Sequence, residues 1–260
     1  MHAKKKIVEN WLPRYTGLQL EEFGQYILLT NFKDYVTHFA TKMGVEVKGV
    51  DKPMQSATKN NMTIVYFTMG SPMAATIMDL LGAISPKAVL FLGKCGSLKN
   101  YIGVGEFILP IAAIRGEGTS SDYFPPEVPS LPAFNLEKAI STTVRDYHLD
   151  YWTGNVYTTN KRVWEHDQNF LDYLKKIRAT CIDMETATLF SVGFANRIPT
   201  GALLIVSDKP YIEEGLENEE SDKLLAEKYA DLHLNIGIES LKQLINKGLT
   251  VKHLRFDYYE

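Results

Sequence analysis

The sequence has 260 residues, 45% of them hydrophobic, which is enough for one α/β domain or two small ones. A formal net charge of −3 and an isoelectric point near 6.1 exclude the basic face that non-specific nucleic-acid binding requires. No apolar run approaches the roughly 18 residues of a membrane span, and no signal-peptide core is present. Cys95 and Cys181 lack metal-ligand spacing, so we expect both to be buried free thiols. Free thiols are typical of a reducing compartment, and we therefore expect a cytoplasmic protein. We expect neither a metal ion nor a cofactor.

Strand-like and helix-like runs alternate along the chain, which predicts an α/β protein with a largely parallel sheet. The expected strands are 26–30, 63–68, 88–92, 107–115, 155–159 and 201–206. The expected helices are 33–42, 72–81, 136–147, 169–176, 185–194 and 224–245. Because no repeat or long linker divides the chain, residues 1–260 are expected to form a single domain with residues 1–24 as an N-terminal extension. The basic run at residues 4–6 is expected to be a solvated turn.

Two apolar runs end in acidic side chains. Cys181-Ile182 precedes Asp183-Met184-Glu185, and Leu204-Ile205-Val206-Ser207 precedes Asp208. An unpaired buried carboxylate is costly, whereas ligands bind at the carboxyl ends of strands in open α/β sheets. A carboxylate accepts two hydrogen bonds side by side, which suits a vicinal diol such as that of ribose. The acids therefore predict a pocket in which one carboxylate holds a polyol and another donates a proton, although Asp183 alone is better explained as a helix cap.

Two glycine-containing turns are expected at strand ends. Gly70-Ser71-Pro72 opens a helix whose free N–H groups suit a phosphate, but many helices begin this way for structural reasons. Gly93-Lys94-Cys95-Gly96 allows a ligand to approach the backbone, and a lysine there needs an anionic partner. The spacing matches neither a Walker loop nor a dinucleotide-binding fingerprint.

The connection from Gly116 to Pro132 is long for a compact domain, which indicates either a functional or a disordered segment. Its aromatic residues, Tyr123 and Phe124, favour an ordered lid or a loop that contacts another subunit.

These motifs, in this order, resemble those of the nucleoside phosphorylase superfamily. Segments within residues 114–129 and 154–167 are similar to AMP nucleosidases, which convert AMP and water to adenine and ribose 5-phosphate. The resemblance implies an α/β fold with a central mixed, partly barrel-like sheet flanked by helices. It also implies a homo-oligomer, a hexamer or smaller ring, in which the loop at residues 116–132 reaches a neighbour's pocket.

The resemblance also implies roles for individual residues. Met184 would pack beneath the ribose, Glu185 would bind its hydroxyls, and Asp208 would protonate the leaving adenine at N7. Asp183 stands where relatives often have glutamate. The segment from Tyr157 to Trp164 lies where the purine stacks. The strand-end turns would also contact the substrate and its 5′-phosphate, through Asn31, Lys33, Gly70, Ser71, Gly93 and Lys94. Asn31 and Lys33 are explained equally well as an ordinary helix start.

Asp208 has to hold a proton to act as the acid, and this requires a dry or anionic surrounding because the ordinary pKa of an aspartate is about 3.9. Lys209 would oppose this if it faced inward, but adjacent side chains of a strand point in opposite directions.

Two departures from the family pattern and three alternative functions bear on the reaction. Phosphorylases of this superfamily place an arginine at the position of Phe91, so the apolar side chain favours water as the nucleophile. Because only about 24 residues precede the first strand, we expect the regulatory domain of longer AMP nucleosidases to be absent. The alternatives are a methylthioadenosine or S-adenosylhomocysteine nucleosidase, which Lys94 disfavours, a purine nucleoside phosphorylase in which Arg115 contacts phosphate, and a non-catalytic nucleotide sensor.

Overall fold

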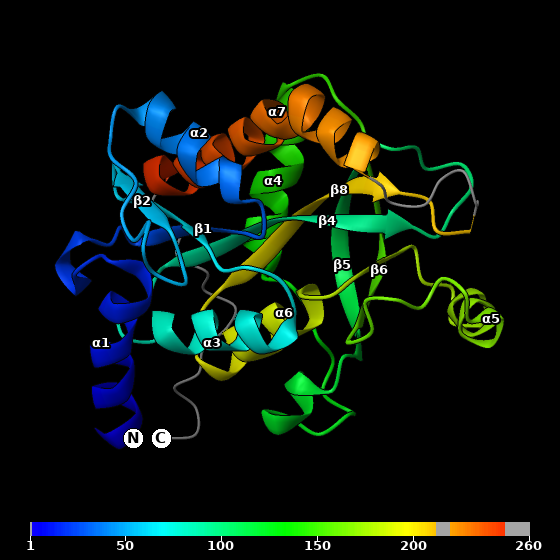
Figure 1. Cartoon of the computed structure of the whole chain (residues 1–260), viewed down its shortest axis with the longest axis horizontal. Coiled ribbons are helices and arrows are strands. Elements are labelled where there is room, and N and C mark those ends of the chain that lie inside the picture. The colour runs from blue at the N-terminus through cyan, green and yellow to red at the C-terminus, as the bar shows by residue number, and fades with distance from the viewer. Residues whose placement is uncertain (1, 212–218, 248–260) are drawn as a thin grey trace.

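The centre of the molecule is one continuous mixed β-sheet (Figure 1). The structure is a computed structural model that describes residues 2–211 and 219–247. The strands are β1 (Tyr26–Thr30), β2 (Ser56–Lys59), β3 (Met62–Tyr66), β4 (Ala88–Ser97), β5 (Phe107–Gly116), β6 (Tyr151–Thr159), β7 (Cys181–Asp183) and β8 (Thr200–Asp208). The eight strands follow the order β2-β3-β1-β4-β7-β6-β5-β8, and β4 also pairs with β8. The strands from β4 to β8 in that order therefore close into a barrel, from which β1, β3 and β2 extend. The predicted α/β class with a mixed, partly barrel-like sheet is confirmed.

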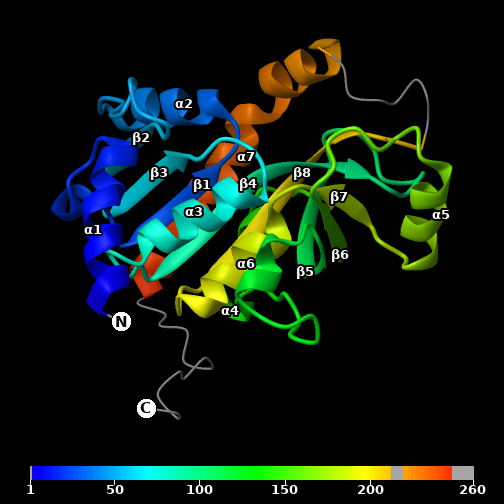
Figure 2. The same ribbon diagram turned by 60° about the horizontal axis from the view of Figure 1, so that its bottom comes forward.

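Helices cover both faces of this sheet. They are α1 (His2–Thr16), α2 (Lys33–Met43), α3 (Ser71–Leu81), α4 (Phe134–Asp146), α5 (Gln168–Lys176), α6 (Thr186–Ala195) and α7 (Glu219–Lys247), with short 3₁₀ turns η1 (Leu20–Glu22) and η2 (Thr119–Asp122). Helices α1, α3 and α6 share one apolar core with the sheet, and α2, α4 and α7 share a second core on its other face (Figures 1 and 2). Helix α5 packs at the side, in a third cluster with residues of β6 and β7.

The central strands are apolar because both of their faces are covered. All five residues of β1 are buried, and β1 pairs in parallel with β3 and with β4. Parallel strands enclosed by helices are expected to be continuous hydrophobic runs rather than alternating ones. The register aligns Thr30 of β1 with Tyr66 of β3 and with Leu92 of β4, so β1 and β3 end side by side while β4 continues to Ser97.

The sequence-based prediction missed three elements. Strands β2 and β7 have only four and three residues, too few for a periodic pattern to be visible. The basic run at residues 4–6 is not a solvated turn: it lies in the 15-residue helix α1, where Lys4 forms an ion pair of 2.7 Å with Asp79 of α3. The predicted turn at Gly93–Gly96 is also wrong, because β4 continues through Ser97.

None of the helices in the described ranges is long and apolar enough to cross a membrane.

Candidate active site

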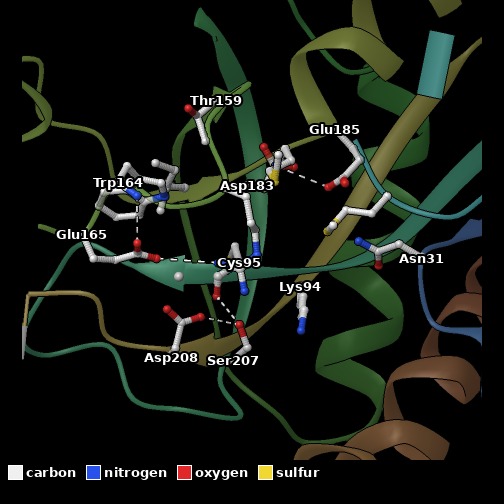
Figure 3. A pocket seen from close by; sticks show the side chains of 15 residues that line it. Asn31, Lys94, Cys95, Thr159, Trp164, Glu165, Asp183, Glu185, Ser207 and Asp208 are labelled. Carbon is white, nitrogen blue, oxygen red and sulfur yellow. Dashed lines mark hydrogen bonds and ion pairs between the residues drawn. The ribbon is translucent and has the colours of Figure 1, made fainter. Parts of the chain in front are cut away.

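A pocket that is partly open to solvent lies where β1, β4, β6, β7 and β8 end (Figure 3). Seven of the predicted site residues line it: Asn31, Lys94, Trp164, Asp183, Met184, Glu185 and Asp208. The lining residues that we did not predict are Met69, Cys95, Gly96, Thr159, Arg162, Glu165, Ile182 and Ser207.

Glu185 is held by backbone donors on one side of the pocket. The N–H of Gly70 donates to Glu185 Oε1 at 2.7 Å, and the N–H of Met184 donates to Oε2 at 3.3 Å. Burial, followed by the nearby charge of Asp183, raises the pKa of Glu185 to about 8. The backbone donors and the charge of Lys94 act in the opposite direction. The carboxyl group is therefore fixed in place and close to its titration point at neutral pH.

The predicted residues Gly70 and Ser71 support this turn instead of lining the pocket. Gly70 has a φ of 96°, and the Ser71 hydroxyl donates to the Met184 carbonyl at 2.6 Å. Thr68, two residues earlier, has a φ of 72°, which is strained for a β-branched residue. The loop before α3 thus has an unusual backbone that directs the Gly70 N–H group toward Glu185.

Asp183 has a structural arrangement of its own. Its Oδ1 accepts from the Thr158 hydroxyl at 2.7 Å, and its Oδ2 accepts from the N–H and the hydroxyl of Thr186 at 2.8 and 2.5 Å. Burial raises the pKa of Asp183, and these hydrogen bonds oppose that shift. Both oxygens are engaged in holding the start of α6 against β6, as a capping residue does.

Asp208 is the last residue of β8. The Ser207 hydroxyl lies 2.5 Å from Asp208 Oδ1 and 3.3 Å from the Cys95 carbonyl oxygen. A hydroxyl can donate to a carboxylate, or accept from a carboxylic acid while it donates to the carbonyl. Ser207 can therefore satisfy Asp208 in either protonation state. Lys209 faces away, since its ammonium donates to the Asn100 carbonyl at 2.7 Å.

The predicted phosphate ligands are only partly brought together. Lys94 and Asn31 both line the pocket, and Asn31 Oδ1 is buried with no hydrogen bond from any residue in the described ranges. Lys33 is exposed in the first turn of α2 and is not among the lining residues.

Of the two predicted aromatic contacts, only Trp164 reaches the pocket. It is buried with its ring edge-on to Phe170. Tyr157 instead packs behind the wall, edge-on to Phe170 and Tyr173. A Cβ at Gly116 would lie 2.2 Å from the Tyr157 ring, so the glycine gives that ring its space.

Gly93 also has a packing role. A Cβ built on it would lie 2.2 Å from the ring of Phe91. Phe91 is fully buried and its ring packs against that of Phe67, with 5.7 Å between centroids. The position that bears arginine in related phosphorylases therefore faces the hydrophobic core and not the pocket.

The loop at residues 116–132 is ordered around Arg115. The Arg115 guanidinium donates to the Ser120 hydroxyl and to the carbonyls of Phe124, Pro125 and Val128. The Tyr123 hydroxyl donates to Asp79 at 2.8 Å, which attaches the loop to α3. None of residues 116–132 is among the described residues that line the pocket.

The segment between β6 and α5 supplies two side chains that we did not predict. Glu165 and Arg162 both line the pocket, with 3.7 Å between Glu165 Oε1 and an Arg162 nitrogen. They lie within residues 154–167, which resemble AMP nucleosidases, but the side chains of that stretch that we predicted to contact the substrate were Tyr157 and Trp164. Within residues 2–211 and 219–247, no three His, Cys, Asp or Glu side chains are grouped in a way that could hold a metal ion.

Comparison with known proteins places this arrangement in a family. Residues 26–241 match the Phosphorylase superfamily. The chain belongs to that superfamily. An AMP nucleosidase structure from Bacteroides thetaiotaomicron is 52% identical, with a TM-score of 0.85, and the alignment covers 94% of this chain and 99% of that one.

Two further superfamily members are less similar to this chain. The AMP nucleosidase of Escherichia coli is 26% identical over 91% of this chain, which spans only 58% of that longer protein. A uridine phosphorylase structure from Vibrio fischeri is 22% identical with a TM-score of 0.76, covering 86% of this chain and 93% of that one, and it supports the fold alone.

Proposed function

We propose that this superfamily member hydrolyses AMP to adenine and ribose 5-phosphate. The observation that carries the proposal is that one pocket contains a backbone-held glutamate, Glu185, and a carboxyl group with a hydroxyl partner, Asp208. The 52% identity to an AMP nucleosidase supports the same reaction.

Glu185 holds the ribose in this proposal. Its fixed carboxylate accepts hydrogen bonds from the 2′- and 3′-hydroxyls, and Met184 packs beneath the sugar. The pKa of Glu185 is about 8 in the free protein. Hydrogen bonds from the two ribose hydroxyls favour the ionised form of Glu185, so this carboxyl group ionises as AMP binds. The negative charge then stabilises the positive charge that develops on the ribose as the glycosidic bond breaks.

Asp208 acts as the general acid. It donates its proton to N7 of the purine as the bond between C1′ and N9 breaks and water adds to C1′. The proton released by that water returns the aspartate to its acid form through solvent. Ser207 can accept from the acid and donate to the carboxylate, so it supports both states during the cycle. General acid catalysis of this kind contributes about 10²–10⁴-fold.

The 5′-phosphate serves as a handle that positions the reacting bond. Lys94 supplies a positive charge and Asn31 supplies an amide, and both side chains line the pocket. An uncharged 5′ substituent, as in methylthioadenosine, would leave Lys94 without this use.

Phosphorolysis is disfavoured by two observations. Phe91 occupies the position of the phosphate-binding arginine and is buried against Phe67. Arg115, the other arginine considered, is engaged by four hydrogen bonds inside its own loop. Water is therefore the nucleophile in our proposal.

Chromatography of AMP after incubation with the pure protein, with and without inorganic phosphate, tests this function. We expect adenine and ribose 5-phosphate in both samples. Product that forms only with phosphate, together with a sugar 1-phosphate, would show a phosphorylase. Intact AMP in both samples would rule out the proposal and leave methylthioadenosine hydrolysis or nucleotide sensing to be tested.

We also propose a cytoplasmic homo-oligomer, a hexamer or smaller ring. Cys95 and Cys181 are free and buried, which is consistent with a reducing compartment. Exposed apolar side chains near the loop at residues 116–132, namely Leu131, Phe134 and Phe194, are consistent with subunit contacts. Light scattering after size-exclusion chromatography measures the assembly, and a monomer under assay conditions would contradict it.

A further inference from the structure

We propose that Glu165 is the residue that selects a 6-aminopurine over a 6-oxopurine, an inference that rests on the proposed hydrolysis of AMP. Glu165 lies on the irregular segment between β6 and α5, within the stretch that resembles AMP nucleosidases, and no role was predicted for it from the sequence.

The position of Glu165 places it at the base end of the pocket. It lines the pocket together with Trp164 and Asp208, and its side chain is only 23% exposed. Figure 3 shows Glu165, Trp164 and Asp208 along the same side, away from Glu185 and Asn31. If Glu185 holds the ribose, the purine extends toward Asp208 and therefore toward Glu165.

The carboxylate of Glu165 keeps a free acceptor. Its Oε2 accepts from the Trp164 N–H group at 2.9 Å, which fixes the side chain against its own backbone. Its Oε1 lies 3.7 Å from an Arg162 nitrogen, beyond hydrogen-bonding distance. Oε1 can therefore accept one more hydrogen bond from a ligand.

Purine chemistry identifies the donor. N7 and the substituent at position 6 lie on the same edge of the base, so a group that protonates N7 brings position 6 near its neighbours. Adenine presents an N–H donor at position 6, whereas guanine and hypoxanthine present an oxygen acceptor. An ionised carboxylate can only accept, so it binds the amino group and repels the oxygen.

The proposed reaction uses Asp208 at N7, and the Ser207 hydroxyl lies 2.5 Å from Asp208 Oδ1. We assign the 6-amino group to Glu165, whose Oε1 accepts no hydrogen bond from a residue in the described ranges.

Steady-state kinetics with AMP and with inosine 5′-monophosphate test the assignment, with release of the base as the readout. In Glu165→Gln, the kcat/KM for AMP is expected to fall about 10–100-fold, while that for the 6-oxo nucleotide stays level or rises. The glutamine keeps an oxygen for the Trp164 N–H group, so a purely structural role predicts no change in the ratio of the two substrates. Glu46→Gln, whose carboxylate is exposed, is the matched control.

A substrate change in the wild-type protein gives a second test that does not depend on a variant. Purine riboside 5′-phosphate lacks the 6-amino group, so it is expected to lose about the same factor that Glu165→Gln loses with AMP. The variant is expected to be insensitive to this change of substrate. An unchanged substrate ratio in Glu165→Gln, or equal losses on removing the amino group from both proteins, would overturn the assignment. Absence of adenine release by the wild type would instead show that the proposed function is wrong.

Discussion

Asp183 and Asp208 each end a buried strand at the same pocket, yet their surroundings differ. Three donors on Thr158 and Thr186 use both oxygens of Asp183. Asp208 faces the Ser207 hydroxyl, which has a second acceptor within reach in the Cys95 carbonyl. The number and flexibility of the donors, and not the position at a strand end, distinguish a carboxylate that holds the fold from one that can exchange a proton.

The strongest test of this comparison is Asp208→Asn. Turnover of AMP is expected to fall by about 10²–10⁴-fold, because an amide cannot donate a proton to N7. The dissociation constant of AMP, measured by calorimetry on the slow variant, is expected to change little. Near-normal turnover in this variant would show that Asp208 is not the acid.

Asp183→Ala tests the other side of the comparison. Removing the carboxylate leaves buried donors on Thr158 and Thr186 without partners, so the free energy of unfolding is expected to fall by about 1–3 kcal/mol. Urea denaturation measures this loss, and Asp150→Ala, with a side chain that is 95% exposed, is the control. If Asp183→Ala kept full stability but lost as much turnover as Asp208→Asn, the distinction between the two acids would fail.

Glu137 of α4 extends the comparison to a buried acid with few partners. Its Oε1 accepts from the Ala202 N–H group at 3.3 Å, and its Oε2 accepts from no residue in the described ranges. Burial raises the pKa of Glu137 well above its ordinary value. The folded protein therefore holds a proton that the unfolded chain releases above its ordinary pKa of about 4.3. This contribution to stability is present at lower pH and is lost as the pH rises toward the folded pKa, by about 1.4 kcal/mol per pH unit.

Glu137→Gln is expected to remove this dependence, because the amide keeps an acceptor for Ala202 and never ionises. Urea denaturation at pH 5.5 and pH 8 is expected to show the variant gaining on the wild type at the higher pH. An equal difference between the two proteins at both pH values would mean that Glu137 is ionised in the fold.

The sequence pointed to the pocket residues that follow buried apolar runs. Glu185 and Asp208 were predicted because an acid after an apolar run is unusual. Lys94 was predicted from the glycine-containing turn, and Met184 from the family resemblance. Glu165 and Arg162 were missed because the segment between β6 and α5 is irregular, and no spacing rule shows where its side chains point. The strand β7 was missed because three residues carry no periodicity.

The two glycines of β4 show why local motifs mislead. Both were predicted to allow a ligand to approach the backbone, and the sequence gives no means of distinguishing them. The structure separates them through residues that lie elsewhere in space: Gly93 makes room for the Phe91 ring, whereas Gly96 lies against Asp208. Such packing depends on tertiary contacts that a pattern of residue types does not contain.

Gly96→Ala tests the smallest displacement in the site. A Cβ at this position would lie 3.0 Å from Asp208 Oδ2 and 3.0 Å from Cγ of Pro210, so the carboxylate has to shift by a few tenths of an ångström. Since misplacing a reacting group by 1 Å costs about 10²-fold, a loss in kcat of about tenfold or less is expected, with AMP affinity nearly unchanged. Gly103→Ala is the matched control, because the nearest atom to its added Cβ is 3.8 Å away.

A double variant shows whether Gly96 acts through Asp208. Gly96→Ala combined with Asp208→Asn is expected to lower kcat almost no further than Asp208→Asn alone, since the displaced group is then no longer an acid. An additional loss in the double variant would mean that Gly96 acts on the pocket through Pro210 or the β4–β8 pairing and not through Asp208.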